Sequence, residues 1–148
     1  MKYKIIMIIA LLVYGCSSAE KVFEPKNLET ELQIVVKGVK SEGGNVNVAV
    51  YDSKDRFLKA EKAIILAYRK SYTPDMVFIV KGKLAPARYA ILVFHDENGN
   101  GALDTFKSGV PKEGVGSSNN PKGFPTWETS NFLVLGKSKK VEVQIAYP

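Results

Sequence analysis

Cysteine and histidine are almost absent from this sequence. Cys16 is the only cysteine and His95 the only histidine in 148 residues. A single cysteine excludes an internal disulfide, and one histidine with no cysteine after residue 16 argues against a zinc site and a cysteine nucleophile. We expect His95 to brace the neighbouring loop through a hydrogen bond, because a general base would need a partner acid within reach on the same face.

Motifs for nucleotide and serine-hydrolase chemistry are missing as well. The sequence has no glycine-rich phosphate loop and no G-x-S-x-G elbow. Positive charge is also not concentrated: the formal net charge is +6, but only Arg69-Lys70 and Lys139-Lys140 are adjacent basic pairs. Nucleic-acid-binding proteins usually gather basic residues on one face, so the composition indicates a mildly basic, solvated surface and no nucleic-acid partner.

Long apolar runs are confined to the N-terminus. Residues 5–14 are apolar, follow Lys2 and Lys4, and form a run too short to span a bilayer. This pattern predicts an export signal over residues 1–16. Residues 12–16, Leu-Val-Tyr-Gly-Cys, resemble the lipobox of bacterial lipoproteins, which implies lipidation of Cys16. Cleavage of an ordinary signal peptide after Ser17-Ser18-Ala19 is the alternative.

The expected location follows from that signal. Lipidation at Cys16 implies a protein held on the bacterial cell envelope, at the outer membrane, whereas ordinary cleavage implies secretion into the periplasm. Residues 17–30 are polar and aperiodic, so we interpret them as a tether between the anchor and a domain spanning residues 31–148.

Alternating apolar residues indicate that the domain is built from β-strands. The clearest strand covers residues 45–51, and the alternating segment 32–36 is predicted to pair with it as a hairpin around Gly43-Gly44. Residues 89–94 have few polar side chains, which predicts a central strand buried on both faces. The apolar run 63–68 cannot be assigned to helix or strand by its period alone.

Further strands are predicted at residues 76–80, 132–135 and 141–147. About seven short strands without a long helix predict an all-β protein, a single antiparallel β-sandwich of the transthyretin or immunoglobulin type. Its predicted core includes seven inward-facing residues: Val46, Val48, Val50, Ile91, Val93, Val143 and Ile145.

The candidate metal-binding side chains are concentrated in one stretch, His95 to Asn120. Side-chain oxygens occupy the first, third, fifth and ninth places of a loop, at Asp96, Asn98, Asn100 and Asp104. Gly101 stands at the sixth place, where a sharp turn would bring round the carbonyl of Ala102 as a fifth oxygen donor. This is the front part of an EF-hand-type calcium loop, and we interpret it as a calcium site.

The twelfth place of the loop departs from that pattern. It holds Lys107, a cation that cannot bind calcium in place of the usual bidentate acid. Another ligand would have to come from elsewhere, and the candidates are Glu113, Asn119, Asn120 and Asp52. With two carboxylates around the ion, we expect weak binding, roughly 10⁻⁴–10⁻³ M. A metal-free turn rich in Asx and glycine is the alternative.

The same stretch resembles a known family. Residues 89–104, 109–114 (Gly-Val-Pro-Lys-Glu-Gly) and 118–120 (Ser-Asn-Asn) are similar to the DUF2141 family of exported bacterial proteins, whose function is unassigned, and the similarity covers residues 32–147. Locally, D-x-N-x-N-G-x-x-D followed by G-V-P is similar to the calcium loops of B-type repeats in bacterial surface adhesins, which are transthyretin-like sandwiches. The resemblance implies an exported β-sandwich and transfers no function.

Aromatic residues near the C-terminus suggest a binding surface. Phe124 lies in a Gly-Pro loop and is a candidate for exposure, whereas Trp127, the other candidate, is expected to pack in the core. Tyr89 is expected to bond back to the backbone as a tyrosine corner.

These observations favour a non-enzymatic, lipid-anchored envelope domain, stiffened by calcium, that interacts with an envelope protein or a glycan. A second hypothesis is a carbohydrate- or peptide-binding module that uses Phe124 and residues 109–123. A hydrolase is the third and weakest hypothesis, because no acid–base pair is evident.

Overall fold

The chain folds into two β-sheets packed face to face. The computed structural model describes residues 30–40, 43–82 and 84–148. The predicted signal (1–16) and tether (17–30) lie outside the described residues, except for Thr30. The strands are β1 (Thr30–Lys37), β2 (Asn45–Tyr51), β3 (Ile65–Lys70), β4 (Asp75–Gly82), β5 (Ala87–Asp96), β6 (Gly114–Ser117), β7 (Phe132–Val134) and β8 (Ser138–Gln144). A 3₁₀ helix (Ala60–Lys62) and the short helix α1 (Trp127–Ser130) complete the elements.

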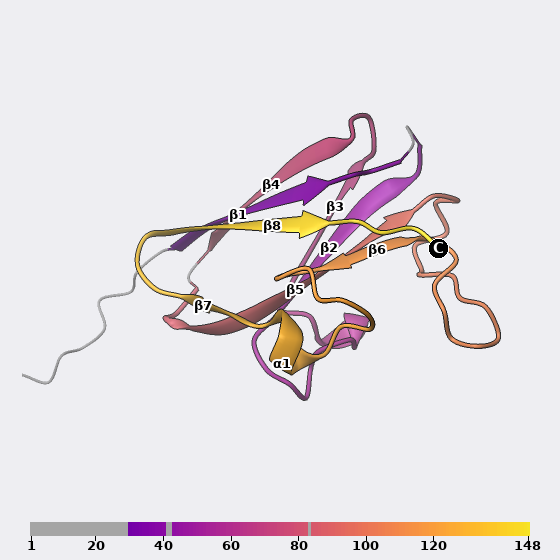
Figure 1. Ribbon diagram of the computed structural model, residues 1–148. Coiled ribbons are helices and arrows are strands. Elements are labelled where there is room, and N and C mark those ends of the chain that lie inside the picture. The colour runs from indigo at the N-terminus through magenta and orange to yellow at the C-terminus, as the bar shows by residue number, and fades with distance from the viewer. Residues whose placement is uncertain (1–29, 41–42, 83) are drawn as a thin grey trace, which may run out of the picture.

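The smaller sheet has the order β4-β1-β8 and the larger sheet the order β3-β2-β5-β6, with β7 pairing with the start of β5 (Figure 1). The predicted β-sandwich is therefore confirmed. It has eight strands instead of about seven, and β1 pairs with β8 in parallel while the other pairs are antiparallel. No helix in the described part of the chain is long and apolar enough to cross a bilayer.

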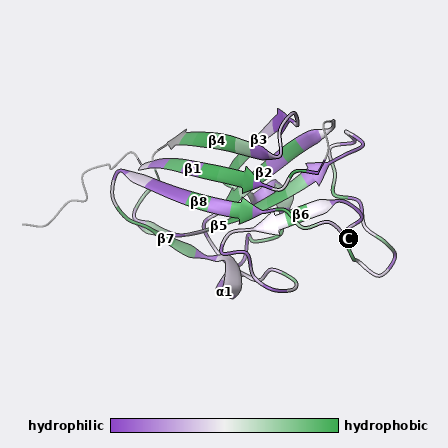
Figure 2. Ribbon diagram, turned by 45° about the horizontal axis from the view of Figure 1, so that its top comes forward, coloured by the Kyte–Doolittle hydropathy of each residue, from purple (hydrophilic) through white to green (hydrophobic). Residues whose placement is uncertain are grey.

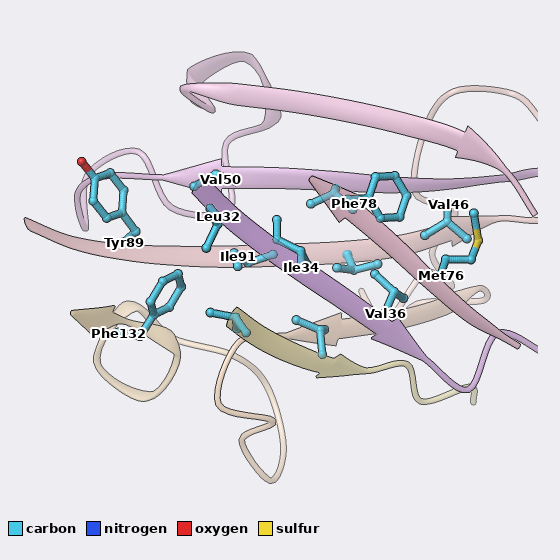
Figure 3. Close-up of a cluster of buried hydrophobic side chains, with 14 of the residues drawn as sticks. Leu32, Ile34, Val36, Val46, Val50, Met76, Phe78, Tyr89, Ile91 and Phe132 are labelled. Carbon is cyan, nitrogen blue, oxygen red and sulfur yellow. The ribbon is translucent and has the colours of Figure 1, made fainter. Parts of the chain in front are cut away.

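The core lies between the two sheets. Leu32 and Ile34 of β1 point toward Val50 of β2 and Ile91 of β5 (Figure 3). All seven predicted core residues are at most 4% exposed, which confirms the alternation from which they were chosen. Full burial of each such side chain contributes roughly 1.5–3 kcal/mol. Figure 2 shows the matching pattern, with hydrophobic residues concentrated on β1 and β4 and hydrophilic residues in the loops.

The predicted hairpin between residues 32–36 and 45–51 is wrong. β1 pairs with β4 and β8, whereas β2 pairs with β3 and β5, so the chain crosses from one sheet to the other between them. Each of the two strands has an apolar face, and the faces cover each other across the core. Gly44 does not form a two-residue hairpin turn but lets its backbone lie close to that of Asp96. Its φ is +61°, and a Cβ there would lie 2.0 Å from the carbonyl oxygen of Asp96.

The larger sheet carries the functional loop. β5 is its central strand, as predicted, but Leu92 and Phe94 on its outer face are only half-buried. The apolar run 63–68 belongs mostly to β3. β6 was not expected, because it lies within the glycine-rich stretch after the loop. Beyond β8, the backbone of Ala146 pairs with Val115 of β6, which joins the two sheets along one side.

Candidate functional site

The predicted calcium loop connects the central strand β5 to β6. It starts at Asp96, the last residue of β5, and returns to the sheet at Glu113, just before β6; we call it the Asp96–Glu113 loop. In Figure 1 it projects from the sandwich beside the C-terminus. Its outer half is a small hairpin in which Thr105 bridges to Pro111. The loop is therefore held at both ends by the larger sheet.

Asp96 organises the first turn of the loop. Its side chain is only 1% exposed, and its two carboxylate oxygens accept backbone N–H groups from Asn100 (3.0 Å) and Gly101 (2.9 Å). The side-chain oxygens of Asn98 and Asn100 make similar local bonds, to the N–H groups of Asn100 (2.9 Å) and Ala102 (2.8 Å). These bonds form successive Asx turns, which wind the chain around a common centre.

Two of the predicted ligands, Asn98 and Asn100, meet a third at Asp104. Its Oδ2 accepts hydrogen bonds from the side-chain amides of Asn98 (2.6 Å) and Asn100 (3.1 Å). Two amides and one carboxylate from the third, fifth and ninth places of the loop are thus within direct contact. Alternate side chains therefore converge, as the spacing predicts.

Glu113 closes the loop. It is 5% exposed, and its Oε1 accepts the N–H of Glu97 while its Oε2 accepts the N–H of Asp104, both at 3.0 Å. One carboxylate therefore ties the start of the loop to its ninth place. Among the four candidates for a further calcium ligand, Glu113 is the one that contacts the loop.

The other three candidates are engaged elsewhere. Asp52 pairs with Arg56 at 3.2 Å. Asn119 donates to the carbonyls of Thr129 and Asn131, and Asn120 accepts the N–H of Gln144 at 2.7 Å. Lys107 is exposed in the outer half of the loop.

The donor set suits a hard cation only in part. Carboxylate and amide oxygens are the ligands that calcium prefers, and a carboxylate has about four lone-pair sites. Asp96 and Glu113 each use two of these sites on backbone N–H groups, so each keeps capacity for an ion. Within the described residues, however, no group of three or more Asp, Glu, His or Cys side chains is arranged to hold a metal. An ion here would depend on the amides of Asn98 and Asn100.

His95 lies directly before the loop and is fully buried. Its Nε2 is 2.8 Å from the carbonyl oxygen of Gly43, and its Nδ1 is 2.8 Å from the hydroxyl of Tyr147. Because a carbonyl can only accept, Nε2 carries the hydrogen, and in the neutral ring Nδ1 then accepts from Tyr147. The Tyr147 hydroxyl also accepts the N–H of Lys40, and burial raises its pKa. His95 thus links β5 to two neighbouring segments, and both of its nitrogens are occupied.

An apolar groove runs beside the loop. Its volume is about 680 Å³, and its floor is the outer face of the larger sheet, at Leu92, Phe94 and Val115. One wall is the Asp96–Glu113 loop, through Leu103, Val110 and Pro111, and the other wall is Phe124 and Pro125, with Leu58 at one end. We call this feature the apolar groove.

The two predicted surface aromatics have different surroundings. Phe124 lines the groove and is 70% exposed. Trp127, at the start of α1, is half-buried and packs edge-on against Phe57 at 6.2 Å between ring centroids. Thr126 caps α1 by accepting the N–H of Thr129. Tyr89 donates its hydroxyl hydrogen to the carbonyl of Ala85 at 2.9 Å, which confirms the expected bond to the backbone.

The chain can be assigned to a family by comparison with known protein families. A family model described as "Uncharacterized protein conserved in bacteria (DUF2141)" matches residues 34–142. The chain belongs to the DUF2141 family. This DUF2141 match runs from β1 to β8 and includes both the loop and the groove. No curated protein and no solved structure matches the chain.

The sequence pointed to one side of the groove, Phe124 and residues 109–123, but not to its floor, although β5 carried a signal for it. Leu92 and Phe94 are apolar on the face opposite Ile91 and Val93, and this was interpreted as burial on both faces. On the outer face, Leu92 packs against a small second cluster of Tyr51, Phe57 and Ala90, and Leu92 and Phe94 also line the groove with the loop and Phe124. Apolar residues on both faces of a strand can therefore also indicate a binding surface.

Proposed function

We propose that this DUF2141 domain is a non-enzymatic binding module of the bacterial cell envelope, anchored through a lipid on Cys16, whose Asp96–Glu113 loop is ordered by calcium. The observation that carries the proposal is the apolar groove walled by that loop. Large exposed apolar surfaces on soluble domains usually mark binding sites, and a groove of about 680 Å³ is in the range of small-molecule sites, about 300–1,000 Å³.

The groove's lining supports binding over catalysis. Of the lining side chains in the described part of the chain, Ser108 is the only one with a potential nucleophile, and no acid, histidine or cysteine is among them. A hydrolase would require a nucleophile and base within about 2.6–3.2 Å. His95 does not supply that base, because it faces the interior and is bonded to Gly43 and Tyr147.

The proposed calcium ion would be held by Asp96, Asn98, Asn100, Asp104 and the carbonyl of Ala102, with Glu113 as a further ligand. It would neutralise the two aspartates and replace the hydrogen bonds at Asp104. The side-chain oxygens of Asn98 and Asn100 each accept one backbone N–H and keep a second lone pair for the ion, while their NH₂ groups would give up Asp104. The local similarity to the calcium loops of adhesin B-type repeats supports the same assignment.

Thermal unfolding with and without calcium tests this part of the proposal. An ion that binds only the folded protein adds about 1.4 kcal/mol at tenfold excess over its dissociation constant. The melting temperature should therefore rise in millimolar calcium and fall with chelator. Asp96→Ala should erase the rise, because it removes a charge and a ligand, and magnesium should act poorly because it needs a tighter octahedral shell.

Lys107→Glu is the matched gain-of-function variant. It supplies an acid at the twelfth place and should enlarge the calcium effect, while Lys137→Glu makes the same charge change in the loop before β8. Superimposable melting curves in calcium and chelator, with no heat of calcium binding in calorimetry, would show that the loop is a metal-free Asx turn.

The anchor is tested by mass spectrometry of the mature protein. Lipidation should add the mass of acyl chains at Cys16, and Cys16→Ser should abolish it. Stable attachment requires more than one chain, because a single acyl chain binds membranes only marginally. An unmodified mature chain beginning at Glu20 would instead indicate a secreted protein.

Carbohydrate or peptide binding is the second candidate function, and the exposed ring of Phe124 favours it. Sugar sites combine an aromatic platform with polar partners, whereas this lining is predominantly apolar. Trp127 is engaged with Phe57 and does not extend the platform. The geometry therefore supports an apolar ligand better than a glycan.

A further inference from the structure

We propose that the apolar groove binds a free fatty acid, with the alkyl chain on the floor of the groove and the carboxylate at a rim of lysines. This inference rests on the binding role proposed above and names its ligand. Its test requires neither bound calcium nor a lipid on Cys16.

The floor and walls require a ligand with a long apolar part. Leu92, Phe94 and Val115 are neighbours across β5 and β6, and Phe124 stands 70% exposed beside them. Leu103 and Val110, which line the same groove, are 39% and 52% exposed. Covering such surface is favourable by roughly 25 cal/mol per Å², and an alkyl chain does so without needing hydrogen-bond partners.

Lysines next to the groove favour a ligand with a negatively charged end. Lys59, Lys107, Lys112 and Lys122 are exposed, and each is next in sequence to a residue that lines the groove. We call them the lysine rim. The one acid next to a lining residue is Asp104, which already accepts hydrogen bonds from two asparagines. Within residues 30–40, 43–82 and 84–148, none of the four rim lysines forms an ion pair with a carboxylate. Lys59 donates to the carbonyl of Asp55 at 2.8 Å, and Lys112 lies over the ring of Phe106 at 5.5 Å from its centroid, so the positive charges of all four remain uncompensated. The rim therefore complements an anionic end group.

A bound peptide strand fits the groove less well. Its backbone N–H and C=O groups would need partners, which strand addition obtains from a free sheet edge. At the floor, β5 is already paired on both sides, with β2 and with β6 and β7. Val115 of β6 is paired with Ala146 on its other side. No free backbone edge faces the groove in the described structure.

A second copy of the chain and a bilayer surface fit less well for other reasons. A two-fold dimer through the groove would place two lysine rims against each other, and like charges repel. A bilayer-inserting surface presents protruding apolar residues, whereas these residues line a hollow. A single chain lying in the hollow satisfies both the apolar lining and the charged rim.

The experiment measures binding of palmitate to the full-length Cys16→Ser chain, which lacks an acyl chain that could compete. Displacement of a fluorescent fatty acid, checked by calorimetry below the aggregation concentration of palmitate, gives affinity and stoichiometry. We expect one palmitate per chain, no binding of butyrate, and weaker binding of neutral monopalmitoylglycerol.

Variants locate the site. Leu92→Glu should abolish binding by placing a charge on the floor, while Leu66→Glu, on the outer face of β3, is the matched control and should bind normally. Phe124→Ala should weaken binding without risk to the fold, because the ring is largely exposed. Replacing Lys107, Lys112 and Lys122 with glutamine should weaken palmitate binding by about threefold to tenfold and leave monopalmitoylglycerol unaffected.

Several results would overturn the proposal. They are no saturable palmitate binding, binding unchanged in both Leu92→Glu and Phe124→Ala, or equal affinity for palmitate and monopalmitoylglycerol. Preferential binding to anionic vesicles, to an acidic peptide, or concentration-dependent dimerisation through the groove would assign the surface to those partners. A calcium-dependent rise in melting temperature without palmitate binding would leave the proposed function standing and remove only this inference.

Discussion

Glu113 shows how one buried carboxylate fixes a long loop. Its two oxygens accept N–H groups from residues on opposite sides of the loop, Glu97 and Asp104. A buried charge is tolerated when hydrogen bonds compensate it. Here the compensation comes from backbone groups that would otherwise lack partners, so this side chain determines the loop's shape with or without an ion.

Replacing Glu113 tests that role. Glu113→Gln keeps the size but turns an NH₂ group toward a backbone N–H, so one bond is lost and a buried donor is left unpaired. We expect a loss of about 1–3 kcal/mol in the free energy of unfolding, measured by urea denaturation. Glu97→Gln, at an exposed side chain nearby, should stay within about 0.5 kcal/mol of the parent. Equal effects of the two changes would contradict a bracing role.

Among the elements, β6 depends on its glycines more than on its side chains. A Cβ on Gly114 would lie 2.4 Å from the ring of Tyr147, and one on Gly116 would lie 2.6 Å from the carbonyl oxygen of Gln144. Both glycines let the segment after β8 lie directly against β6, where Ala146 and Val115 exchange hydrogen bonds. The sandwich is closed on this side by close backbone approach.

Gly116→Ala should therefore open that side of the sandwich. The added methyl group meets backbone, which cannot rotate away, so we expect a loss of several kcal/mol, at the upper end of single substitutions. Gly109→Ala is the comparison, because a Cβ there meets nothing within 4 Å and only the positive φ of 82° opposes it. That strain costs about 1–2 kcal/mol. The difference should be visible in thermal melts, and a larger loss for Gly109→Ala would refute the packing argument.

Strands β2 and β6 differ in how far the sequence alone could predict them. Alternation predicts β2 and the core because its period of two is a local property. β6 has no such pattern: Gly-Val-Gly-Ser becomes a strand because β5 and the segment after β8 supply partners. The pairing of β1 with β4 and β8 was missed for the same reason, since strand partners are a property of the whole sheet.

At the site, the sequence predicted the convergence of Asn98, Asn100 and Asp104, because alternate residues in a tight turn point to one side. It could not predict that Glu113 would close the loop or that Phe124 and Val110 would line one groove. Both relations depend on where the chain returns after the loop. Whether calcium is bound remains a prediction, because hydrogen bonds alone satisfy the same donor set.

For the molecule as a whole, the loop and the groove share residues. The Asp96–Glu113 loop contributes Leu103, Val110 and Pro111 to the groove's wall. An ion that orders the loop would fix this wall before a ligand arrives. Calcium and palmitate should then each strengthen the binding of the other by the same factor.

This linkage is measured by titrating palmitate in calcium and in chelator. We expect about fivefold tighter binding with calcium, the lower end of typical couplings, and the same factor when calcium is titrated with and without palmitate. Asp96→Ala should remove the difference between the two buffers. If both ligands bind with no change in either affinity, the wall is already rigid without the ion.

The parallel pairing of β1 with β8 has a consequence for how the chain folds. Thr30, at the start of β1, donates its hydroxyl hydrogen to the carbonyl of Gly136, 106 residues later. β1 lies between β4 and β8, so one of its edges has no partner until the last strand, β8, has docked. A bare apolar strand edge can pair with other chains, so a folding intermediate that lacks β8 is the state most prone to aggregation.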